Sequence, residues 1–344
     1  MMQWPFFNLK LNVAAIAAPA NLKSSKLLPT SSSNLKSLHN PAMSISSFLK
    51  VIGRGSKGAG DLDRNQAKEV FAQILDGKVS DLELGAFCIA MRIKGESVSE
   101  LMGFMDALEP HLSLLNTGSR PTIILPSYNG ARKQANLTPL LAGLLSSQGF
   151  TVLVQGVIKD QTRVTSYAIF ESLGWPILSD AQQFSSLLNS NKPIFCPLRV
   201  ISPALQKLLD VREQIGLRNT GHVLAKLINP STQNAWQVSN YTHPEYPEKL
   251  REFFQLRSAN AILMRGSEGE PTASLQRLPE MHFLFSKGTE ATSPEERFTD
   301  LNPFTAIDAQ STALVTSKML SEEILYPKSI LKQTHEIARM AGLI

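Results

Sequence analysis

Short apolar runs that alternate with helix-like segments constrain the fold of this chain more than any other feature. Four such runs are TIILP (122–126), TVLVQG (151–156), KPIFCPL (192–198) and NAILMRG (260–266). Segments with helical spacing follow at 138–148, 165–173, 203–213 and 245–256. Strands that alternate with helices form a mostly parallel sheet with helices on both faces. We therefore predict an α/β fold whose site lies at the carboxyl ends of the strands, where Gly130, Gly156 and Gly266 would share one rim.

The chain before residue 119 has only helical patterns. Amphipathic segments joined by short turns run from Ser44 to His111, with GRGSKGAG (53–60) breaking the first of them. Ser80 and Glu83 have the spacing of a capping box. These patterns predict a small N-terminal helical domain at 43–118, onto which a helix near 203–222 is a candidate to pack. The α/β domain would then cover 119–344 and end in helices at 305–323 and 328–341.

Residues 1–42 differ from the rest in composition. They are rich in Ser, Asn, Lys and Pro. This composition predicts either a disordered leader or a mis-assigned start codon, with Met43 as the real start. They also hold four lysines and no acid, which leaves 30 basic against 29 acidic residues elsewhere. The net charge of +5 is therefore no evidence that the folded part binds polyanions.

The composition narrows the class of protein. No apolar run reaches the roughly 18–20 residues that span a bilayer, so we predict no membrane partner. Cys88 and Cys196 lie in apolar contexts without metal-binding spacing, which favours buried thiols in a reducing compartment. We accordingly predict a cytoplasmic protein that needs no metal and no other cofactor.

The stretch 126–140, PSYNGARKQANLTPL, has the order strand, turn, cation pair, helix. α/β proteins usually hold phosphate at such a place, because amides at a helix N-terminus point outward and its dipole favours an anion. This turn has one glycine, Gly130, and two cations, Arg132 and Lys133, where nucleotide-binding turns have several glycines. Basic side chains are therefore predicted to replace close backbone contact with phosphate.

Several long motifs resemble one superfamily. Residues 73–101 resemble the N-terminal helices of the anthranilate phosphoribosyltransferase and pyrimidine nucleoside phosphorylase superfamily, which is glycosyltransferase family 3. VREQIGLRNTGHVLAKLINP (211–230) resembles its arginine-bearing helix and the Asn-Pro that follows. With 126–141 and HPEY (243–246), the resemblance narrows to the nucleic-acid-binding, YbiB-type branch. It covers about 43–344 and implies a nucleoside phosphorylase/phosphoribosyltransferase-like fold and a homodimer built through the helical domain.

The chain departs from working transferases at three motifs. Tyr128-Asn129-Gly130 stands for their Gly-Thr-Gly-Gly turn, and Val154-Gln155-Gly156-Val157 stands for Lys-His-Gly-Asn. The stretch 268–272, EGEPT, lacks their adjacent Asp-Glu pair for magnesium. Phosphoribosyl transfer needs amides and Mg²⁺ aimed at a leaving pyrophosphate. We therefore predict a scaffold that no longer transfers, with no catalytic residue and no metal ligand, although enzymatic activity stays an open question.

The candidate phosphate-binding residues follow the strand ends, the arginine helix and the glycine-rich loop. They are Asn129, Gly130, Arg132, Lys133, Lys159, Arg163, Arg212, Arg218, His222, Arg54 and Lys57. Each has a structural alternative: a solvated helix start for Arg132 and Lys133, neutralisation by Asp160 for Lys159 or Arg163, and a helix linker for 53–60. Arg218 and His222 are four apart, which predicts one face of one helix.

Three further groups fit structural roles better. Arg92 and Lys94 suit a helix C-terminus, and Tyr128 suits packing in a turn more than stacking on a base. Glu268 and Glu270 suit ordinary loop acids more than a remnant metal site.

Together these features favour sequence-nonspecific binding of DNA or RNA by a degenerate phosphoribosyltransferase scaffold. The first alternative is an active phosphoribosyltransferase, a pentosyl-transferring glycosyltransferase that acts on an aromatic or nucleobase acceptor. The second alternative is a non-catalytic sensor of a small phosphorylated metabolite.

Overall fold

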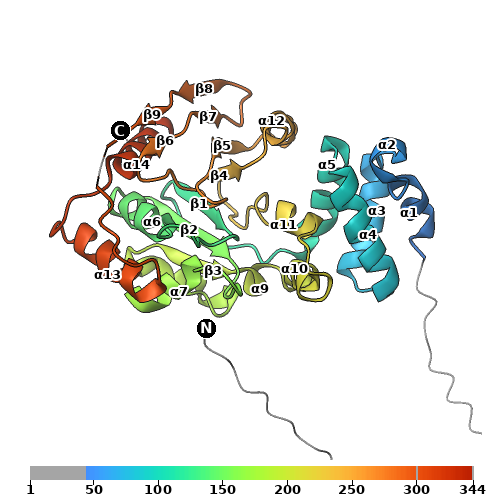
Figure 1. Ribbon diagram of the computed structural model, residues 1–344, viewed down its shortest axis with the longest axis horizontal. Coiled ribbons are helices and arrows are strands. Elements are labelled where there is room, and N and C mark those ends of the chain that lie inside the picture. The colour runs from blue at the N-terminus through green and yellow to red at the C-terminus, as the bar shows by residue number, and fades with distance from the viewer. Residues whose placement is uncertain (1–43, 300, 343–344) are drawn as a thin grey trace, which may run out of the picture. The chain divides into compact units, whose positions relative to one another are not determined.

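The computed structural model describes residues 44–299 and 301–342 (Figure 1). The predicted leader at 1–42 lies outside these residues. The first described part is helical, with α1 (Ser46–Ile52), α2 (Gly55–Gly58), α3 (Arg64–Leu75), α4 (Asp81–Lys94), α5 (Val98–Leu108) and the 3₁₀ turn η1 (Glu109–His111). Position 53–60 is therefore not simply a break, because Gly55–Gly58 form one short helix.

Local sequence explains where these helices begin. α3, α4 and α5 each start with a reciprocal capping box, and the one predicted at Ser80 and Glu83 is confirmed. α3 and α5 pack closely, since a Cβ on Gly103 would lie 2.3 Å from the Arg64 carbonyl oxygen. Phe71 and Phe104 pack in this core with ring centroids 4.9 Å apart and ring planes tilted by 37°.

The second part is built on a seven-stranded sheet with the order β3-β2-β1-β4-β5-β7-β8. β1 (Thr122–Ser127), β2 (Thr151–Gly156), β3 (Ile194–Pro197), β4 (Ala235–Tyr241) and β5 (Asn260–Arg265) are parallel. β7 (Met281–Leu284) and β8 (Glu290–Ser293) add an antiparallel edge, and β6 (Arg277–Leu278) pairs separately with β9 (Glu296–Arg297). The predicted mostly parallel sheet is confirmed, whereas β4 and the antiparallel edge were not predicted.

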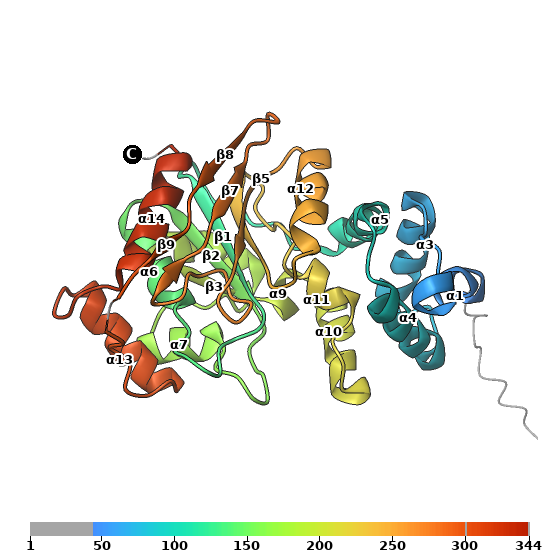
Figure 2. The same ribbon diagram turned by 45° about the horizontal axis from the view of Figure 1, so that its top comes forward.

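Helices cover both faces of the sheet, as predicted. Side chains along β1 alternate between two cores, with Ile123 in one and Ile124 in the other. The Ile123 core includes α6 (Thr138–Ser147), α7 (Ser166–Leu173), α13 (Ala309–Leu320) and α14 (Lys328–Met340). The Ile124 core includes α9 (Leu198–Ile201), α10 (Pro203–Ile215), α11 (Thr220–Leu224) and α12 (Tyr246–Leu256). Figure 2 shows α13 and α14 on one side of the sheet and α10 to α12 on the other. Short helical segments occupy the connection before β3: η2 (Ala181–Gln183), α8 (Phe184–Leu187) and η3 (Leu188–Ser190).

The predicted arginine helix is not one helix. α10 ends at Ile215, and Gly216 takes a left-handed conformation with φ of 70° before α11 begins at Thr220. Arg212 therefore lies in the last turn of α10, Arg218 lies in the connection, and His222 lies in α11. The prediction that Arg218 and His222 share one helix face is wrong, because glycine and the Asn219 cap separate two helices.

Candidate functional site at the carboxyl rim of the sheet

The carboxyl ends of β1, β2 and β5 meet at one rim with close backbone contacts. Ser127 pairs in register with Gly156, and a Cβ on Gly156 would lie 2.1 Å from the Ser127 carbonyl oxygen. After β5, a Cβ on Gly266 would lie 2.1 Å from the Glu270 carbonyl oxygen. No side chain fits at either position, so glycine lets the loop after β5 fold back toward the turn after β1.

The turn after β1 is occupied by a carboxylate of the same chain. Glu270 Oε1 accepts hydrogen bonds from the amides of Asn129 at 3.0 Å and Gly130 at 2.8 Å. Its Oε2 accepts from the hydroxyl groups of Ser127 and, at 3.0 Å, Thr138. Glu270 is 1% exposed. Amides that would face a phosphate in a nucleotide-binding turn are therefore already bound to a buried anion.

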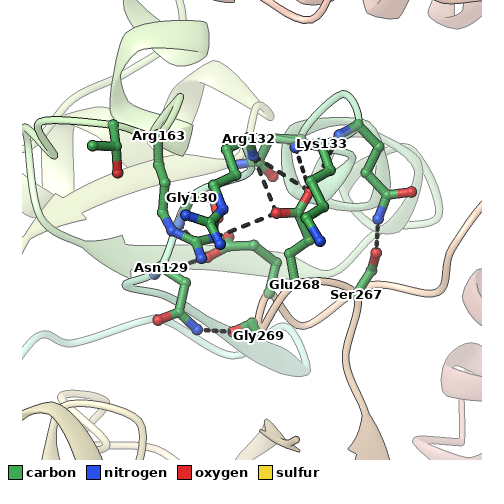
Figure 3. Close-up of polar contacts among 12 residues, drawn as sticks. Asn129, Gly130, Arg132, Lys133, Arg163, Ser267, Glu268 and Gly269 are labelled. Atoms are coloured by element: carbon green, nitrogen blue, oxygen red, sulfur yellow. Dashed lines mark hydrogen bonds and ion pairs between the residues drawn. The ribbon is translucent and has the colours of Figure 1, made fainter.

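Glu268 does the same for the next three residues (Figure 3). Its carboxylate accepts from the amides of Arg132 at 3.2 Å, Lys133 at 2.9 Å and Gln134 at 3.2 Å. The side chain is 13% exposed, so this contact lies nearer the surface than that of Glu270. Glu268 and Glu270 are thus not ordinary loop acids, because together they accept hydrogen bonds from five backbone amides of the turn.

The same two carboxylates do not fit the magnesium seat that the superfamily resemblance implies. Both oxygens of Glu270 and both oxygens of Glu268 already accept hydrogen bonds from the turn. A hard cation needs several oxygen ligands that are free to coordinate it. Within 44–299 and 301–342, no group of three or more His, Cys, Asp or Glu side chains could hold a metal ion. We therefore assign no metal chemistry to this loop.

The backbone amides of Arg132 and Lys133 belong to this network, but no hydrogen bond or ion pair joins their side chains to it. Both residues are exposed, and no carboxylate in the described part of the chain pairs with either side chain. They are not at a helix start, because α6 begins at Thr138. Asn129 and Gly130, in contrast, are buried and bound internally, so phosphate could reach their amides only by displacing Glu270.

The cations that follow β2 divide into paired and unpaired groups. Arg163 donates to the Gly130 carbonyl oxygen at 2.9 Å and pairs with Glu268 at 3.4 Å. Asp160 neutralises neither Lys159 nor Arg163 but pairs with Arg212 at 2.9 Å. Burial would raise the pKa of the Asp160 carboxyl, but hydrogen bonds from the Thr162 amide and from Arg212 outweigh burial and lower it. Lys159 is exposed, and it lines with Arg212 a cavity of about 460 Å³.

Arg218 connects the turn to a second cavity. Its guanidinium donates to Asn129 Oδ1, and its main-chain oxygen accepts from Arg92 at 3.0 Å. Burial and the nearby arginines Arg212 and Arg163 lower the Arg218 pKa. His222 lines the same second cavity, and burial with the neighbouring Arg218 lowers the His222 pKa to about 3. His222 is therefore neutral at physiological pH and supplies no charge to an anion.

The remaining candidates lie apart from the turn. Arg54 and Lys57 are exposed on α1–α2, where Arg54 donates to the Lys50 carbonyl oxygen. Tyr128 is 3% exposed, so it packs in the core and offers no face to a base. Lys94 pairs with Asp61 at 2.5 Å and Glu100 at 2.7 Å, which is a structural role.

Two features were missed from the sequence. The anchoring role of Glu268 and Glu270 depends on a contact across 130 residues and more, which spacing in the sequence does not reveal. Lys226 was not singled out, although its ammonium donates to Asn240 Oδ1 at 3.0 Å beside the second cavity. The Lys226–Asn240 pair joins the segment after α11 to the end of β4, a strand that the apolar pattern had not predicted.

Comparison with known proteins places the chain in a family. The helical bundle domain of the glycosyl transferase family matches residues 46–110. Over 244 residues the chain is 44% identical to the uncharacterized protein YbiB of Escherichia coli K12, which covers 70% of this chain and 76% of YbiB. The chain belongs, with YbiB, to the glycosyltransferase family 3, anthranilate phosphoribosyltransferase-like superfamily.

More distant members of this superfamily include enzymes. The anthranilate phosphoribosyltransferase of Oceanobacillus iheyensis is 27% identical over 63% of this chain and 64% of that enzyme. The crystal structure of the Thermus thermophilus anthranilate phosphoribosyltransferase has a TM-score of 0.65 at 21% identity, over 83% of this chain and 85% of that one. The Saccharomyces cerevisiae enzyme with PRPP and Mg has a TM-score of 0.67 at 15% identity, over 86% and 88%. These structures share the fold with this glycosyltransferase family 3 member.

The described residues contain no helix long and apolar enough to cross a membrane.

Proposed function

We propose that this protein binds nucleic acid without sequence preference, on a phosphoribosyltransferase-like scaffold that does not transfer phosphoribosyl groups. One observation carries the proposal. Glu268 and Glu270 accept the hydrogen bonds of the turn amides, while the Arg132 and Lys133 side chains stay exposed. Activated ribose needs those amides and a metal, whereas a polyanion needs only accessible cations. The arrangement disfavours transfer and leaves electrostatic binding possible.

Contacts in such a complex would go mainly to phosphate. Arg and Lys side chains position a nucleic acid backbone but carry no sequence information. Of the candidates, the exposed ones are Arg132, Lys133, Lys159, Arg54 and Lys57. Arg163, Arg212 and Arg218 already bind groups of this chain, so their contribution would be the positive potential of the rim.

We further propose a cytoplasmic homodimer assembled through α1–α5. α4 exposes two large apolar side chains, Leu82 at 85% and Ile93 at 57%. Exposed apolar side chains on one helix are a common feature of subunit interfaces. Two copies on one strand would add avidity without any new contact. Sedimentation of the wild type against an Ile93→Glu variant tests this, and an unchanged mass for a folded variant would exclude Ile93 from the interface.

The test of nucleic-acid binding is a titration of a labelled oligonucleotide at several salt concentrations. Phosphate-driven binding weakens linearly on a log–log plot, with a slope of about −0.7 to −0.9 for each contact. The double variant Arg132→Ala, Lys133→Ala should therefore lose about 1.4 to 1.8 from the magnitude of the slope. Scrambling the oligonucleotide sequence should leave the slope unchanged.

A matched control removes two lysines from the opposite rim of the sheet, where the parallel strands begin. Lys192 precedes β3 and Lys287 lies in the β7–β8 hairpin, and both are exposed. Lys192→Ala, Lys287→Ala changes the net charge by the same amount and should leave the slope unchanged. Equal slopes for both double variants, or a flat salt response of the wild type, would contradict the proposal.

An active phosphoribosyltransferase is the second candidate, because curated superfamily members at 27% identity are enzymes of this kind. Pyrophosphate release from phosphoribosyl pyrophosphate, measured with Mg²⁺ and a panel of aromatic and nucleobase acceptors, separates the two candidates. Pyrophosphate release that rises in proportion to protein concentration would show transferase activity and would contradict the proposal of a scaffold that does not transfer.

A further inference from the structure

A second cavity, of about 390 Å³, lies beside the rim. The end of α4, the start of α11, the end of β4 and the start of α12 all contribute to its lining. This volume is in the range of small-molecule sites, which are mostly concave and carry a few convergent polar groups. The cavity is separate from the turn at 127–134, and Arg218 borders both.

One side of the cavity carries positive charge. Lys226 and Arg218 both line it, and the Lys226 ammonium is held by Asn240 at 3.0 Å. Burial lowers the pKa of Lys226 to about 8, while the negative charge of Glu270 opposes this shift. Lys226 is therefore mostly charged at pH 7. An ammonium and a guanidinium that converge on one space are suited to a phosphate or carboxylate group.

The same side has polar groups without partners. Ser239 Oγ and Asn240 Nδ2 are buried and, among the described residues, accept or donate no hydrogen bond. The two residues are 1% and 3% exposed, and both line the cavity. An unpartnered buried polar group costs about 1–3 kcal/mol, so such groups are uncommon and point to a missing partner. Donors at these two positions suit an acceptor-rich ligand.

The other side is aromatic and acidic. Tyr246 and His243 line it with ring centroids 6.4 Å apart, and His243 is exposed. Glu96 lies deeper, where its carboxylate accepts from Thr220 at 2.8 Å and burial raises its pKa. Aromatic rings bind the flat face of a base, and a carboxyl group can accept from its amino groups.

We propose that this cavity binds one nucleoside monophosphate, with its phosphate toward Lys226 and Arg218 and its base toward Tyr246 and His243. The nucleotide is either free or the 5′-terminal residue of a strand. The site does not depend on the exposed cations Arg132 and Lys133, so it goes beyond the proposed function. The protein can bind a nucleic acid without binding a nucleoside monophosphate, and it can bind the monophosphate without binding a nucleic acid. The two proposals can therefore fail separately.

Isothermal titration calorimetry with the full-length protein at pH 7 tests the site. The probes are the four 5′-ribonucleoside monophosphates, with inorganic phosphate and the four nucleosides as partial ligands. At least one monophosphate should saturate one site per chain and bind at least tenfold more tightly than either of its parts. If no monophosphate saturates the folded protein at millimolar concentration, the proposal is overturned.

Variants separate binding from folding. Lys226→Met keeps the length of the side chain but removes its charge, and it should weaken the monophosphate at least tenfold. Lys287→Met, far from the cavity, is the matched control and should change nothing. Because Lys226→Met could disturb the fold, Ser239→Ala serves as the second variant. It removes an unpartnered hydroxyl and should weaken binding threefold or more in a protein whose thermal stability is not reduced. Wild-type affinity in both variants would overturn the proposal.

Two further ligands identify the source of the nucleotide. An oligonucleotide with a 5′-phosphate is compared with the same oligonucleotide ending in a 5′-hydroxyl. A preference for the phosphorylated end that Lys226→Met abolishes supports a terminal nucleotide, whereas free monophosphates that bind without such a preference support a free one. Phosphate alone binding as tightly as every monophosphate would show an anion site only and would overturn the role of the aromatic side.

Discussion

Two polar regions at the carboxyl rim of the sheet differ in how their buried groups are paired. In the turn at 127–134, five amides and two hydroxyl groups donate to Glu268 and Glu270. In the cavity beside β4, Ser239 Oγ and Asn240 Nδ2 stay without partners in the described structure. A turn that resembles an anion site can therefore be closed by its own chain, while a neighbouring cavity keeps unsatisfied donors for a ligand.

The first prediction concerns the charge of the buried Glu270 carboxylate. Glu270→Gln keeps the shape of the side chain but places an NH₂ group opposite donors. We expect the free energy of unfolding to fall by about 3 kcal/mol, because charge-assisted hydrogen bonds contribute more than neutral ones and a buried donor would be left unpaired. Urea denaturation measures this loss.

Glu268→Gln is the matched control for that variant. Its carboxylate is 13% exposed, so water can compensate for the lost charge, and we expect a loss of about 1 kcal/mol. Equal losses for the two variants would mean that burial does not distinguish the two contacts.

The second prediction concerns the loop that carries the carboxylates. Gly269 has φ of 85°, and a Cβ there would lie 1.9 Å from Asn129 Nδ2. Gly288 has the same φ but no heavy atom within 4 Å of such a Cβ. Gly269→Ala should therefore destabilise the protein by about 2–3 kcal/mol, and Gly288→Ala by about 1 kcal/mol, since only the first adds a clash to the backbone strain. Thermal unfolding of both variants checks this, and similar shifts would contradict the close packing of loop and turn.

The third prediction uses the neutral histidine beside the cavity. The pKa of His222 falls from 6.5 to about 3 on folding, so the unfolded chain binds more protons between these values. Stability is complete above pH 6.5 and is lost as the pH falls through this window, by about 1–2 kcal/mol at pH 5 relative to pH 7.

His222→Gln keeps a capping-box residue at the third position of α11 and removes the titrating ring. The variant should lose less stability than the wild type between pH 7 and pH 5 in urea denaturation. If the variant loses as much unfolding free energy between pH 7 and pH 5 as the wild type does, groups other than His222 cause the acid sensitivity.

The smallest expected effects come from one hydroxyl in each region. Ser127 Oγ contacts Ser166 at 2.7 Å and Glu270, so Ser127→Ala should cost about 1 kcal/mol. Ser239→Ala removes a buried hydroxyl without a partner in the described residues, so it should leave the free energy of unfolding unchanged or raise it. Urea denaturation of the free protein measures both effects. Equal losses of unfolding free energy in Ser127→Ala and Ser239→Ala would contradict the difference between the two regions.

Much of the fold follows from short-range patterns. The apolar runs predicted four of the five parallel strands, and the Ser80 and Glu83 spacing predicted a real cap. β4 was missed because AWQVSNY mixes polar and apolar residues even though all but its last residue are buried. Gln237 can lie inside because its amide donates to the Lys226 carbonyl oxygen at 2.6 Å, which no local pattern predicts.

The candidate site was less predictable, because its contacts are long-range. The order of strand, turn and helix along 122–147 was predicted correctly. The sequence offered no carboxylate near Arg132 and Lys133, and the structure brings Glu268 there from beyond β5. Helical spacing placed Arg218 and His222 on one helix, whereas α11 begins only after the Asn219 cap, so Arg218 lies before the helix and His222 within it. A role for any of these residues in binding stays a prediction.

The most direct test of the closed turn is an amide-resolved NMR titration with pyrophosphate and Mg²⁺. The account predicts that the amide signals of Asn129, Gly130 and Lys133 stay in place in the wild type, because Glu268 and Glu270 already accept their hydrogens. In Glu270→Gln the Asn129 and Gly130 signals should move, whereas the Lys133 signal should stay, because Glu268 still accepts from it. Saturable shifts of the Asn129 and Gly130 amides in the wild type would show that diphosphate displaces the carboxylate, and would contradict the account.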